Sequence, residues 1–354
     1  MSRCIEKLTA CIPPEADAVL LTSWVNQLYY TGYNVGLLFS NREESFLLVD
    51  FRNYEEACQK VTACPVVLLE RQEELLSQLF AKYAVKTLAV DADRITVTEL
   101  ARMREQYPGL TILEDSRLSE AISAQRRIKS PEELAKIEQA QRLTDEAFTY
   151  ILDFIRPGRT EREIALELEF YLRKNGAEGP SFNFIVVSDP GSSLPHGRPT
   201  GKEIQKGEFL TMDYGALFEG YHSDMTRTVA IGQVDEEHRR LYNTVLKAQT
   251  AAIDAIALYM KCCQVDKVAR DIIDQAGYQG CFGHGLGHGV GLENHEPSAF
   301  NTRCQDPVVP GMVMTVEPGI YLQGRFGCRI EDMVYIGEDG VRNLTKSEKS
   351  LIEL

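Results

Sequence analysis

The chain has 354 residues and a net charge of −14, so it is long enough for two domains and too acidic for a nucleic-acid partner. No apolar run is long enough to cross a membrane, and the N-terminus lacks the apolar core of a signal peptide. An odd number of cysteines, nine, is scattered along the chain, as is typical of proteins from a reducing compartment. The sequence therefore predicts a cytoplasmic protein without a membrane partner.

Residues 1–123 alternate short apolar runs with stretches of helical periodicity. The runs AVLLT, SFLLVD and TLAVD have the length and composition of buried strands, and residues 73–83 and 96–106 have helical spacing. This alternation is typical of an α/β domain built around a sheet. We expect residues 1–123 to form a smaller N-terminal domain of this kind.

A helix start marks the entry to a second domain. Ser130 is followed by proline and by Glu133, which is the pattern of an N-cap, a first helical residue and a capping-box partner. The same capping box recurs at Thr160, where the next helix is expected to begin. We therefore place a linker at residues 124–133 and the second domain at residues 134–354.

Two aspartates lie on a predicted β-hairpin at residues 208–232, whose two β-rich arms flank a turn at residues 217–220. The midpoint between Asp213 and Asp224 falls inside this turn, so a symmetric turn places them directly opposite each other. Facing carboxylates roughly 5 Å apart repel each other. Two divalent ions between them would remove the repulsion. The alternative is a solvated hairpin whose aspartates point to water.

Two glutamates lie on a second predicted hairpin, in which residues 313–317 and 328–335 form strands joined by a glycine-rich connection. Glu317 ends the first strand, just before a Pro-Gly turn. Glu331 lies inside the second, apolar strand, where a lone carboxylate is unfavourable unless it is paired or bound to metal. A surface salt bridge is the alternative for Glu331.

Between the hairpins, residues 283–297 space His284, His288 and His295 among five glycines. Glycine lets the backbone approach a ligand closely. The spacing fits neither a dinucleotide-binding loop nor a phosphate-binding loop. Each histidine alone could be a hydrogen-bonded core residue, but three of them together with four placed carboxylates indicate metal chemistry.

Helical segments near residues 236–259 and 266–276 separate the two hairpins. Long helices that back curved antiparallel strands predict an α+β fold for the second domain. The concave face of its sheet would hold the carboxylates and the histidines.

The chain carries, in this order, the motifs MDYGA, HSDMTRT, GHGLGHGVGLENHEP, TVEPGIY and RIEDM. This set resembles the metallopeptidases of the pita-bread fold, and within them the proline-specific branch of Xaa-Pro aminopeptidase and prolidase. The resemblance covers the whole chain and implies a pita-bread catalytic domain after a smaller creatinase-like N-terminal domain. It also implies short proline-containing peptides as substrates and a homodimer, in which the N-terminal domain packs against the neighbouring active site.

The resemblance assigns metal ligation to five residues. Asp213 would bind one ion, and His288 and Glu317 would bind the other. Asp224 and Glu331 would bridge both ions. Oxygen-rich sites with a single imidazole suit manganese better than ions that prefer thiolates. We therefore expect two divalent ions, with manganese preferred and cobalt or zinc as alternatives.

Four further residues match the family's catalytic and substrate-binding positions. His196, in SSLPHGRP, and His295 match the two histidines on the substrate side. Arg329 matches an arginine that supports the metal site, and His284 matches a position that either supports the metal ligands or lines the substrate pocket.

The implied reaction begins with a water molecule that bridges two divalent cations and loses a proton near neutral pH, so that hydroxide attacks the peptide carbonyl. By resemblance, Glu317 is the general base, His295 stabilises the oxyanion and His196 orients the substrate. The expected activity is that of an Xaa-Pro aminopeptidase acting on short peptides. The alternative is an Xaa-Pro dipeptidase (prolidase) acting on free dipeptides.

Two other classes of protein fit the sequence less well. A non-proline pita-bread hydrolase such as methionine aminopeptidase is disfavoured by the additional N-terminal domain and by the glycine-rich segment with three histidines. A binding module or a creatinase-like, metal-free enzyme would have lost ligand residues, and this chain has lost none.

Overall fold

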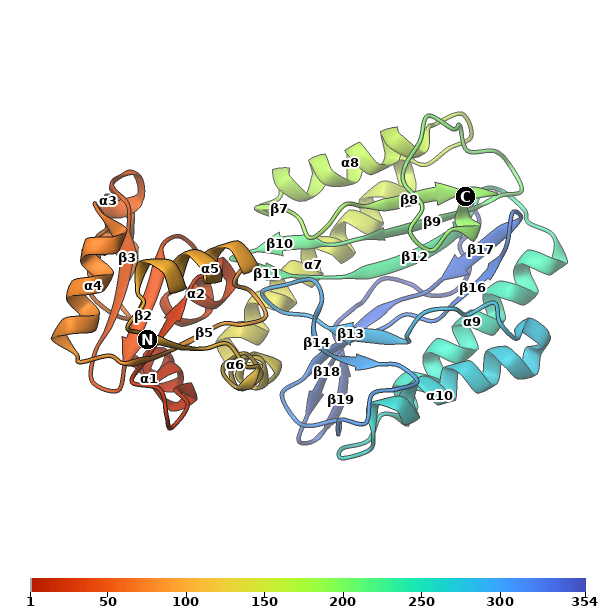
Figure 1. The fold of residues 1–354 in the computed structure, drawn as a ribbon. Helices are drawn as coiled ribbons and strands as arrows, with labels where there is room; N and C mark the ends of the chain where they lie inside the picture. The colour runs from red at the N-terminus through yellow and green to blue at the C-terminus, as the bar shows by residue number, and fades with distance from the viewer. Residues whose placement is uncertain (1) are drawn as a thin grey trace. The chain divides into compact units, whose positions relative to one another are not determined.

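The computed structural model describes residues 2–354, with side chains described from Ile5 onward. The chain divides between Arg126 and Arg127 into two compact units, each of which is described by itself below (Figure 1). Residues at the start of the predicted linker are helical, because helix α6 (Arg117–Arg127) continues through them. Within residues 2–354, no helix has both the length and the apolar character that a bilayer crossing requires.

The first unit has an α/β fold around one six-stranded sheet with the order β4-β3-β2-β1-β5-β6. The two helices predicted from spacing are present as α4 and α5. The strands are β1 (Ala18–Leu21), β2 (Leu37–Asn41), β3 (Ser45–Val49), β4 (Val66–Leu68), β5 (Thr87–Val90) and β6 (Thr111–Leu113). The helices before α6 are α1 (Ser2–Cys11), α2 (Trp24–Thr31), α3 (Phe51–Lys60), α4 (Gln72–Lys82) and α5 (Val97–Gln106).

Both faces of this sheet are buried, because alternate residues of the central strand β1 point into different apolar clusters. Val19 and Leu21 belong to one cluster. Ala18 and Leu20 belong to the other, and all four are fully buried. The unit therefore has the two-sided packing expected of an α/β fold.

The second unit is an α+β fold with several antiparallel sheets, including β12-β9-β8 and β14-β13-β15-β18-β19. Its helices are α7 (Pro131–Phe154), α8 (Glu161–Lys174), η1 (Gly191–Ser193), α9 (Glu236–Ala255), α10 (Cys262–Ile273) and the π-helical turn η2 (Asp274–Tyr278). Its first strands are β7 (Gly179–Pro180), β8 (Ile185–Ser188), β9 (Phe209–Tyr214), β10 (Ala216–Phe218), β11 (Tyr221–His222) and β12 (Met225–Ala230). Its later strands are β13 (Gly287–Gly289), β14 (Glu296–Phe300), β15 (Val313–Val316), β16 (Gly319–Leu322), β17 (Phe326–Arg329), β18 (Asp332–Gly337) and β19 (Gly340–Asn343).

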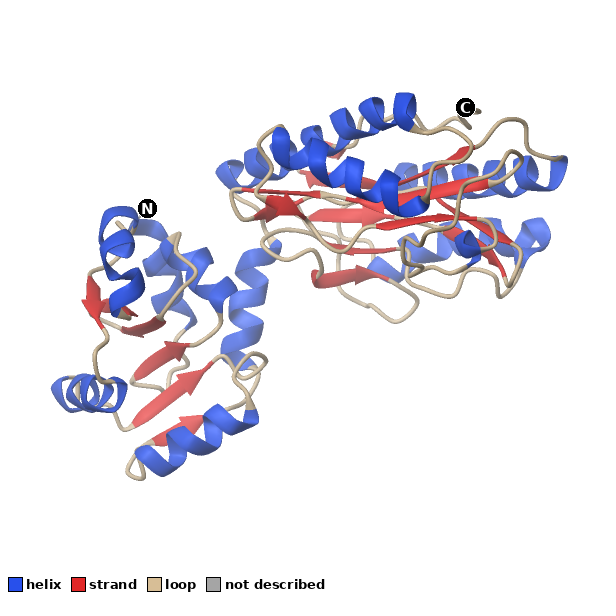
Figure 2. Ribbon diagram, turned by 90° about the horizontal axis from the view of Figure 1, so that it is seen from above, coloured by secondary structure: helices blue, strands red, loops and turns tan. Residues whose placement is uncertain are grey.

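Two pairs of helices back these strands (Figures 1 and 2). α7 and α8 share one apolar core with β8, β9 and β12, and α9 and α10 share another with β15 to β18. The capping boxes predicted at Ser130 with Glu133 and at Thr160 with Glu163 start α7 and α8. The strands between the helix pairs bring the two predicted hairpins together.

The register of the first hairpin differs from the symmetric arrangement predicted from the sequence. Asp213 pairs with Thr226 rather than with Asp224. The turn is centred one residue later than predicted, at Glu219 and Gly220, whose φ angles of 45° and 78° suit a two-residue hairpin turn. Side chains repeat every second residue along a strand, so Asp224 points to the same face as Thr226 and Asp213. The two aspartates are therefore diagonal rather than opposite neighbours.

The second hairpin is interrupted at Glu331, so the prediction that this residue lies inside one strand is wrong. The predicted strand at 328–335 is divided into β17, which pairs with β16, and β18, which pairs with β15. Glu331 lies in the break, where its backbone N–H donates to the carbonyl of Thr226 at 3.1 Å. The last residue pair between β15 and β18 is Val316 with Asp332. Glu317 follows Val316 and Glu331 precedes Asp332, so both glutamates lie one residue beyond the end of this strand pair.

A buried ion pair connects the start of the second unit to β14, the strand that follows His295. Lys129 Nζ donates to Glu296 Oε2 at 2.8 Å, and both side chains are 2 % exposed. Glu296 Oε1 accepts the backbone N–H of Leu292 at 3.0 Å. Because charges this deeply buried need their partners, removing the cation should cost far more than a surface salt bridge is worth.

We predict that Lys129→Met destabilises the protein by about 3–5 kcal/mol, because the Glu296 carboxylate loses its buried cation. The double variant Lys129→Met with Glu296→Gln should regain most of this stability. Chemical denaturation of the wild type and both variants measures the effect. A single variant within about 0.5 kcal/mol of wild type, the range of ordinary surface substitutions, would contradict the prediction.

Candidate metal centre

The first hairpin contributes two buried carboxylates to the site. Asp213 is on β9 and Asp224 immediately precedes β12, with 8 % and 3 % exposure. Close approach of the two arms of the hairpin depends on Gly215, where a Cβ atom would lie 1.9 Å from the carbonyl oxygen of Ser223. Glycine is therefore required at this point of the hairpin.

The imidazole of the site comes from β13. A Cβ atom on Gly287 would lie 2.0 Å from the carbonyl oxygen of Thr315, so glycine there lets β13 lie against β15. His288 Nδ1 lies 3.1 Å from its neighbour's carbonyl oxygen at Gly289, which places the proton on Nδ1 and leaves Nε2 available as a ligand atom. Burial lowers the pKa of His288 to about 3, so the ring is neutral, as metal binding requires.

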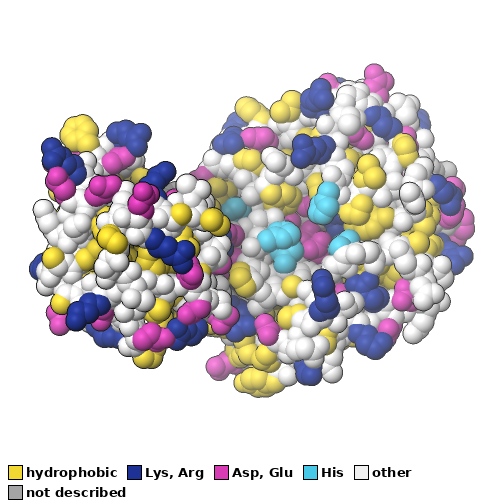
Figure 3. All heavy atoms as spheres, viewed as in Figure 1, with side chains coloured by type: hydrophobic (Ala, Val, Ile, Leu, Met, Phe, Trp, Pro, Cys, Tyr) yellow, Lys and Arg dark blue, Asp and Glu magenta, His cyan; other side chains and the backbone are white. Residues whose placement is uncertain are grey.

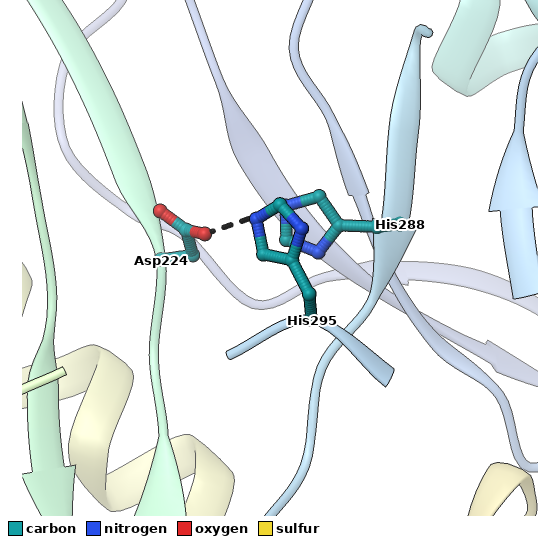
Figure 4. Close-up of side chains that lie close together, drawn as sticks. All are labelled: Asp224, His288 and His295. Atoms are coloured by element: carbon teal, nitrogen blue, oxygen red, sulfur yellow. Dashed lines mark ion pairs between the residues drawn. The ribbon is translucent and has the colours of Figure 1, made fainter. Parts of the chain in front are cut away.

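The ligand atoms of these segments converge. His288 Nε2 lies 3.6 Å from Asp224 Oδ2 and 3.4 Å from Glu317 Oε1, both too long for hydrogen bonds of ordinary length. Figure 4 shows Asp224 and His288 reaching toward each other from different segments of the chain. Within residues 2–354, three overlapping groups place their ligand atoms within 4.8 Å of one another: Asp213, Asp224 and Glu331; His288, Glu317 and Glu331; and Asp224, His288 and His295.

These residues fit a site for divalent cations. Three buried oxygens of this site lack a hydrogen-bond partner among the described residues, namely Asp213 Oδ1, Asp224 Oδ1 and Glu331 Oε1. Burial raises the pKa of Asp224 and Glu331 well above the ordinary range, and neighbouring carboxylates raise both further. Burial also raises the pKa of Glu317 to about 8. Orphaned oxygens with one neutral imidazole are the donor set that hard or borderline divalent ions prefer.

Arg329 holds the carboxylate side of the site in place. Its guanidinium donates to Asp213 Oδ2, and its Nε donates to Thr226 Oγ1 at 3.0 Å. Thr226 Oγ1 in turn donates to Glu331 Oε2 at 2.7 Å. Asp213 and Glu331 thus each give one oxygen to this network and keep the other free for a cation.

The groups lie in a cavity of about 830 Å3 in the second unit. Figure 3 shows histidine side chains gathered over acidic side chains in a hollow of this face. Its walls also contain apolar side chains from the segment around β8, and four arginines. Beside the predicted ligands, these lining residues include Phe182, Phe184, Ile185, Arg198 and Arg303.

All three histidines predicted to act beside the ligands line this cavity. His295 stacks on His288 with ring centroids 3.6 Å apart, which also brings it within reach of a ligand position (Figure 4). His284 Nε2 lies 3.0 Å from the hydroxyl of Tyr321, and burial lowers the pKa of His284 to about 4. His196 projects from the loop that follows η1.

Sequence reasoning missed two residues that hold the site together, Thr226 and Tyr321. Tyr321 is partly buried and its hydroxyl lies between His284 and Arg329, whose Nη1 donates to that hydroxyl at 2.8 Å. Both residues lie inside the quoted motifs, in HSDMTRT and TVEPGIY. Thr226 could have been found from its two-residue spacing from Asp224, which places both side chains on one face of a strand. Tyr321 contacts residues that are not its neighbours in the sequence, so no local pattern indicates its role.

Comparison with known proteins identifies the family. Residues 135–338 match metallopeptidase family M24, and residues 13–128 match the creatinase/prolidase N-terminal domain. The chain belongs to metallopeptidase family M24. The membership confirms the family and the fold class inferred from the five motifs, and it confirms that the protein is a metallopeptidase.

Relatives and solved structures match over nearly the whole chain. The Xaa-Pro dipeptidase of Pyrococcus furiosus is 35% identical over 99% of this chain and 100% of its own. The structure of the Xaa-Pro dipeptidase from Bacillus anthracis is 34% identical, with a TM-score of 0.95 and 99% coverage of both chains. The structure of an X-Pro aminopeptidase from Thermotoga maritima is 32% identical, with a TM-score of 0.90 and the same coverage.

We predict that Asp224→Asn and Glu331→Gln each abolish binding of divalent metal while leaving the fold intact. Hydrolysis should fall by at least about 100-fold, since even residues that only support metal ligands are worth about 10- to 100-fold. Because each change removes one of several crowded carboxylates, the metal-free variants should unfold at or above the temperature of metal-free wild type.

Thermal unfolding with and without manganese, alongside peptide hydrolysis, measures both effects. Glu293→Gln, in the same glycine-rich segment but outside the three ligand groups, is the matched control. Manganese-dependent stabilisation that persists at wild-type strength in either ligand variant would contradict the assignment.

Proposed function

We propose that this M24 metallopeptidase is an Xaa-Pro dipeptidase that hydrolyses the bond before proline in free dipeptides. The observation that carries the proposal is the group of converging ligand atoms with three orphaned carboxylate oxygens in one cavity. Relatives from Pyrococcus furiosus and Pyrococcus horikoshii are named Xaa-Pro dipeptidase, and so is the similar structure from Bacillus anthracis. They favour the dipeptidase alternative over the aminopeptidase activity that the sequence alone led us to prefer.

We propose that two divalent ions, with manganese preferred, occupy the site. Asp213 would hold one ion, and His288 and Glu317 would hold the other. The two shared carboxylates, Asp224 and Glu331, would contact both ions. The overlap of the groups supports this arrangement, because both shared carboxylates occur in two of the three groups. When bound, such ions supply an activated water molecule and polarise the scissile carbonyl.

The surrounding side chains would supply the proton transfers and the orientation. Glu317, partly buried beside His288, would take the proton from the attacking water. His295 would donate to the developing oxyanion from its place beside His288. His196, which lines the same cavity, would orient the substrate, and His284 would shape the pocket because its Nε2 is engaged by Tyr321.

An Xaa-Pro bond is a tertiary amide without an N–H, so recognition relies on the carbonyl and on the proline ring. The apolar wall formed by Phe182, Phe184 and Ile185 offers a surface for a pyrrolidine ring in the same cavity as the ligands. This wall supports a proline-containing peptide as the substrate.

We further propose a cytoplasmic homodimer. The cysteines whose side chains are described are all free thiols, which supports a reducing compartment. Trp24 of α2 is 50 % exposed, an unusual setting for a large aromatic side chain and one that suits a contact with a second copy. Light scattering on the purified protein measures the oligomeric state.

Paired peptides distinguish the two proline-specific activities. We predict that protein stripped of metal and reloaded with manganese cleaves Ala-Pro at a kcat/KM at least about tenfold above that for Ala-Pro-Ala, a difference of about 1.4 kcal/mol. Amino-acid analysis of the products measures both rates. Faster cleavage of the tripeptide would assign the aminopeptidase activity instead, and cleavage of neither by the metal-loaded protein would refute proline specificity.

The two stacked histidines should separate metal binding from catalysis. We predict that His288→Ala loses manganese affinity, whereas His295→Ala retains it and loses about 100- to 1,000-fold in kcat, the scale of one oxyanion donor. Isothermal titration with manganese and steady-state kinetics measure the two effects. Equal loss of affinity in both variants would make His295 a ligand.

A further inference from the structure

The loop that carries His196 is closed at its base by one buried carboxylate. Glu161, the first residue of α8, is 2 % exposed. Its Oε1 accepts the backbone N–H of Ser188 at 2.7 Å and the hydroxyl of Ser188 at 3.0 Å. Its Oε2 accepts the backbone N–H of Thr200 at 3.0 Å and the hydroxyl of Thr200 at 2.7 Å. One side chain therefore binds both ends of the loop.

His196 depends on this loop for its position. Its ring makes no hydrogen bond to another residue within 2–354, although it lines the same cavity as the ligand groups. The cavity side of the loop is held by the Arg329 Nη1 bond to the carbonyl of Pro195, at 3.2 Å, and by the Gly327 N–H bond to Ser192 Oγ, at 2.9 Å. Glu161 holds the opposite side, where the loop leaves β8 and returns.

The chemistry of this contact requires a carboxylate. An ionised carboxylate only accepts hydrogen bonds, and Glu161 faces four donors, two of them backbone N–H groups that cannot reverse their role. A glutamine there would turn its NH2 group toward one of those N–H groups and leave that end of the loop without an acceptor. Charge-assisted bonds of this kind are about twice as strong as neutral ones.

We propose that Glu161 is a positioning residue for the peptidase reaction, acting through the 188–200 loop to aim His196 at the substrate. It touches none of the ligand groups, so it governs substrate orientation without governing metal binding. The inference rests on the proposed function, since it concerns the substrate-side histidine of that reaction.

The test compares Glu161→Gln with Glu163→Gln. Glu163 lies two residues away on the same helix and accepts the backbone N–H of Thr160 in the capping box, so its variant weakens the helix start without touching the loop. With manganese-loaded protein and Ala-Pro, we expect Glu161→Gln to lose about 10- to 100-fold in kcat/KM, the range for a small misplacement of a catalytic group. Manganese affinity of both variants and kcat/KM of the control should stay within about twofold of wild type.

A double-variant cycle separates positioning from general damage. If Glu161 acts through His196, then Glu161→Gln should cost less than about twofold in a His196→Ala background. Full additivity of the two losses would overturn the proposal, as would equal loss of manganese affinity and activity in Glu161→Gln. If Glu161→Gln does not fold, Thr200→Val removes one of the four donors from a surface residue and should give a smaller loss with the same non-additivity.

A readout independent of activity keeps the two claims distinct. Peptide mapping after diethyl pyrocarbonate treatment should show faster modification of His196 in Glu161→Gln than in wild type or in Glu163→Gln, because the loop is less firmly held. An unchanged rate would overturn the positioning role. A wild type that binds manganese but cleaves no Xaa-Pro peptide would instead refute the proposed function, while the modification rates still decide whether Glu161 holds the loop.

Discussion

The crowding of four carboxylates around one neutral imidazole is the constraint on which the second unit depends. Buried charges of one sign are costly unless an opposite charge accompanies them. Arg329 supplies a single positive charge and satisfies only one oxygen of Asp213, so oxygens of Asp213, Asp224 and Glu331 stay orphaned among the described residues. Divalent cations held by these residues would offset this cost, and they would supply an activated water molecule in the cavity.

Several features of the backbone bring the four carboxylates and the imidazole together. The break between β17 and β18 turns Glu331 out of the ladder and toward the site. Glycines at 215 and 287 let neighbouring strands approach closely enough for ligand atoms from separate segments to converge. The helix pairs carry no ligand themselves, but they pack the strands that do, and Glu161 of α8 reaches back to the loop that carries His196.

Local patterns in the sequence were sufficient for the starts of α7 and α8, and the quoted motifs contain the predicted ligands that line the cavity. The capping boxes at Ser130 and Thr160 depend on residues three apart, and the ligand motifs are contiguous strings. The register of the first hairpin was not predictable in the same way. The turn lies one residue later than expected because Glu219 and Gly220 adopt positive φ angles, and no local sequence pattern indicates that Glu219 does so. The division of the strand at Glu331 also depends on a contact with Thr226, which is distant in sequence.

The position of Glu161 is the clearest case of a feature that sequence patterns hide. In the sequence it is one acidic residue in the first turn of a helix, where such residues are common. Its four donors come from residues more than twenty positions away, so only the fold reveals its role. Substrate length is hidden for a related reason, since dipeptidases and an aminopeptidase share this fold with similar identity.

The measurement that tests the central claim most directly is anomalous diffraction at the manganese edge from crystals of manganese-loaded protein. The account predicts two peaks about 3.5–4 Å apart. One peak should lie beside Asp213 and the other beside His288 and Glu317, with Asp224 and Glu331 contacting both. No peak at these residues in crystals grown with saturating manganese, or a single peak that leaves Asp213 without a cation, would contradict it.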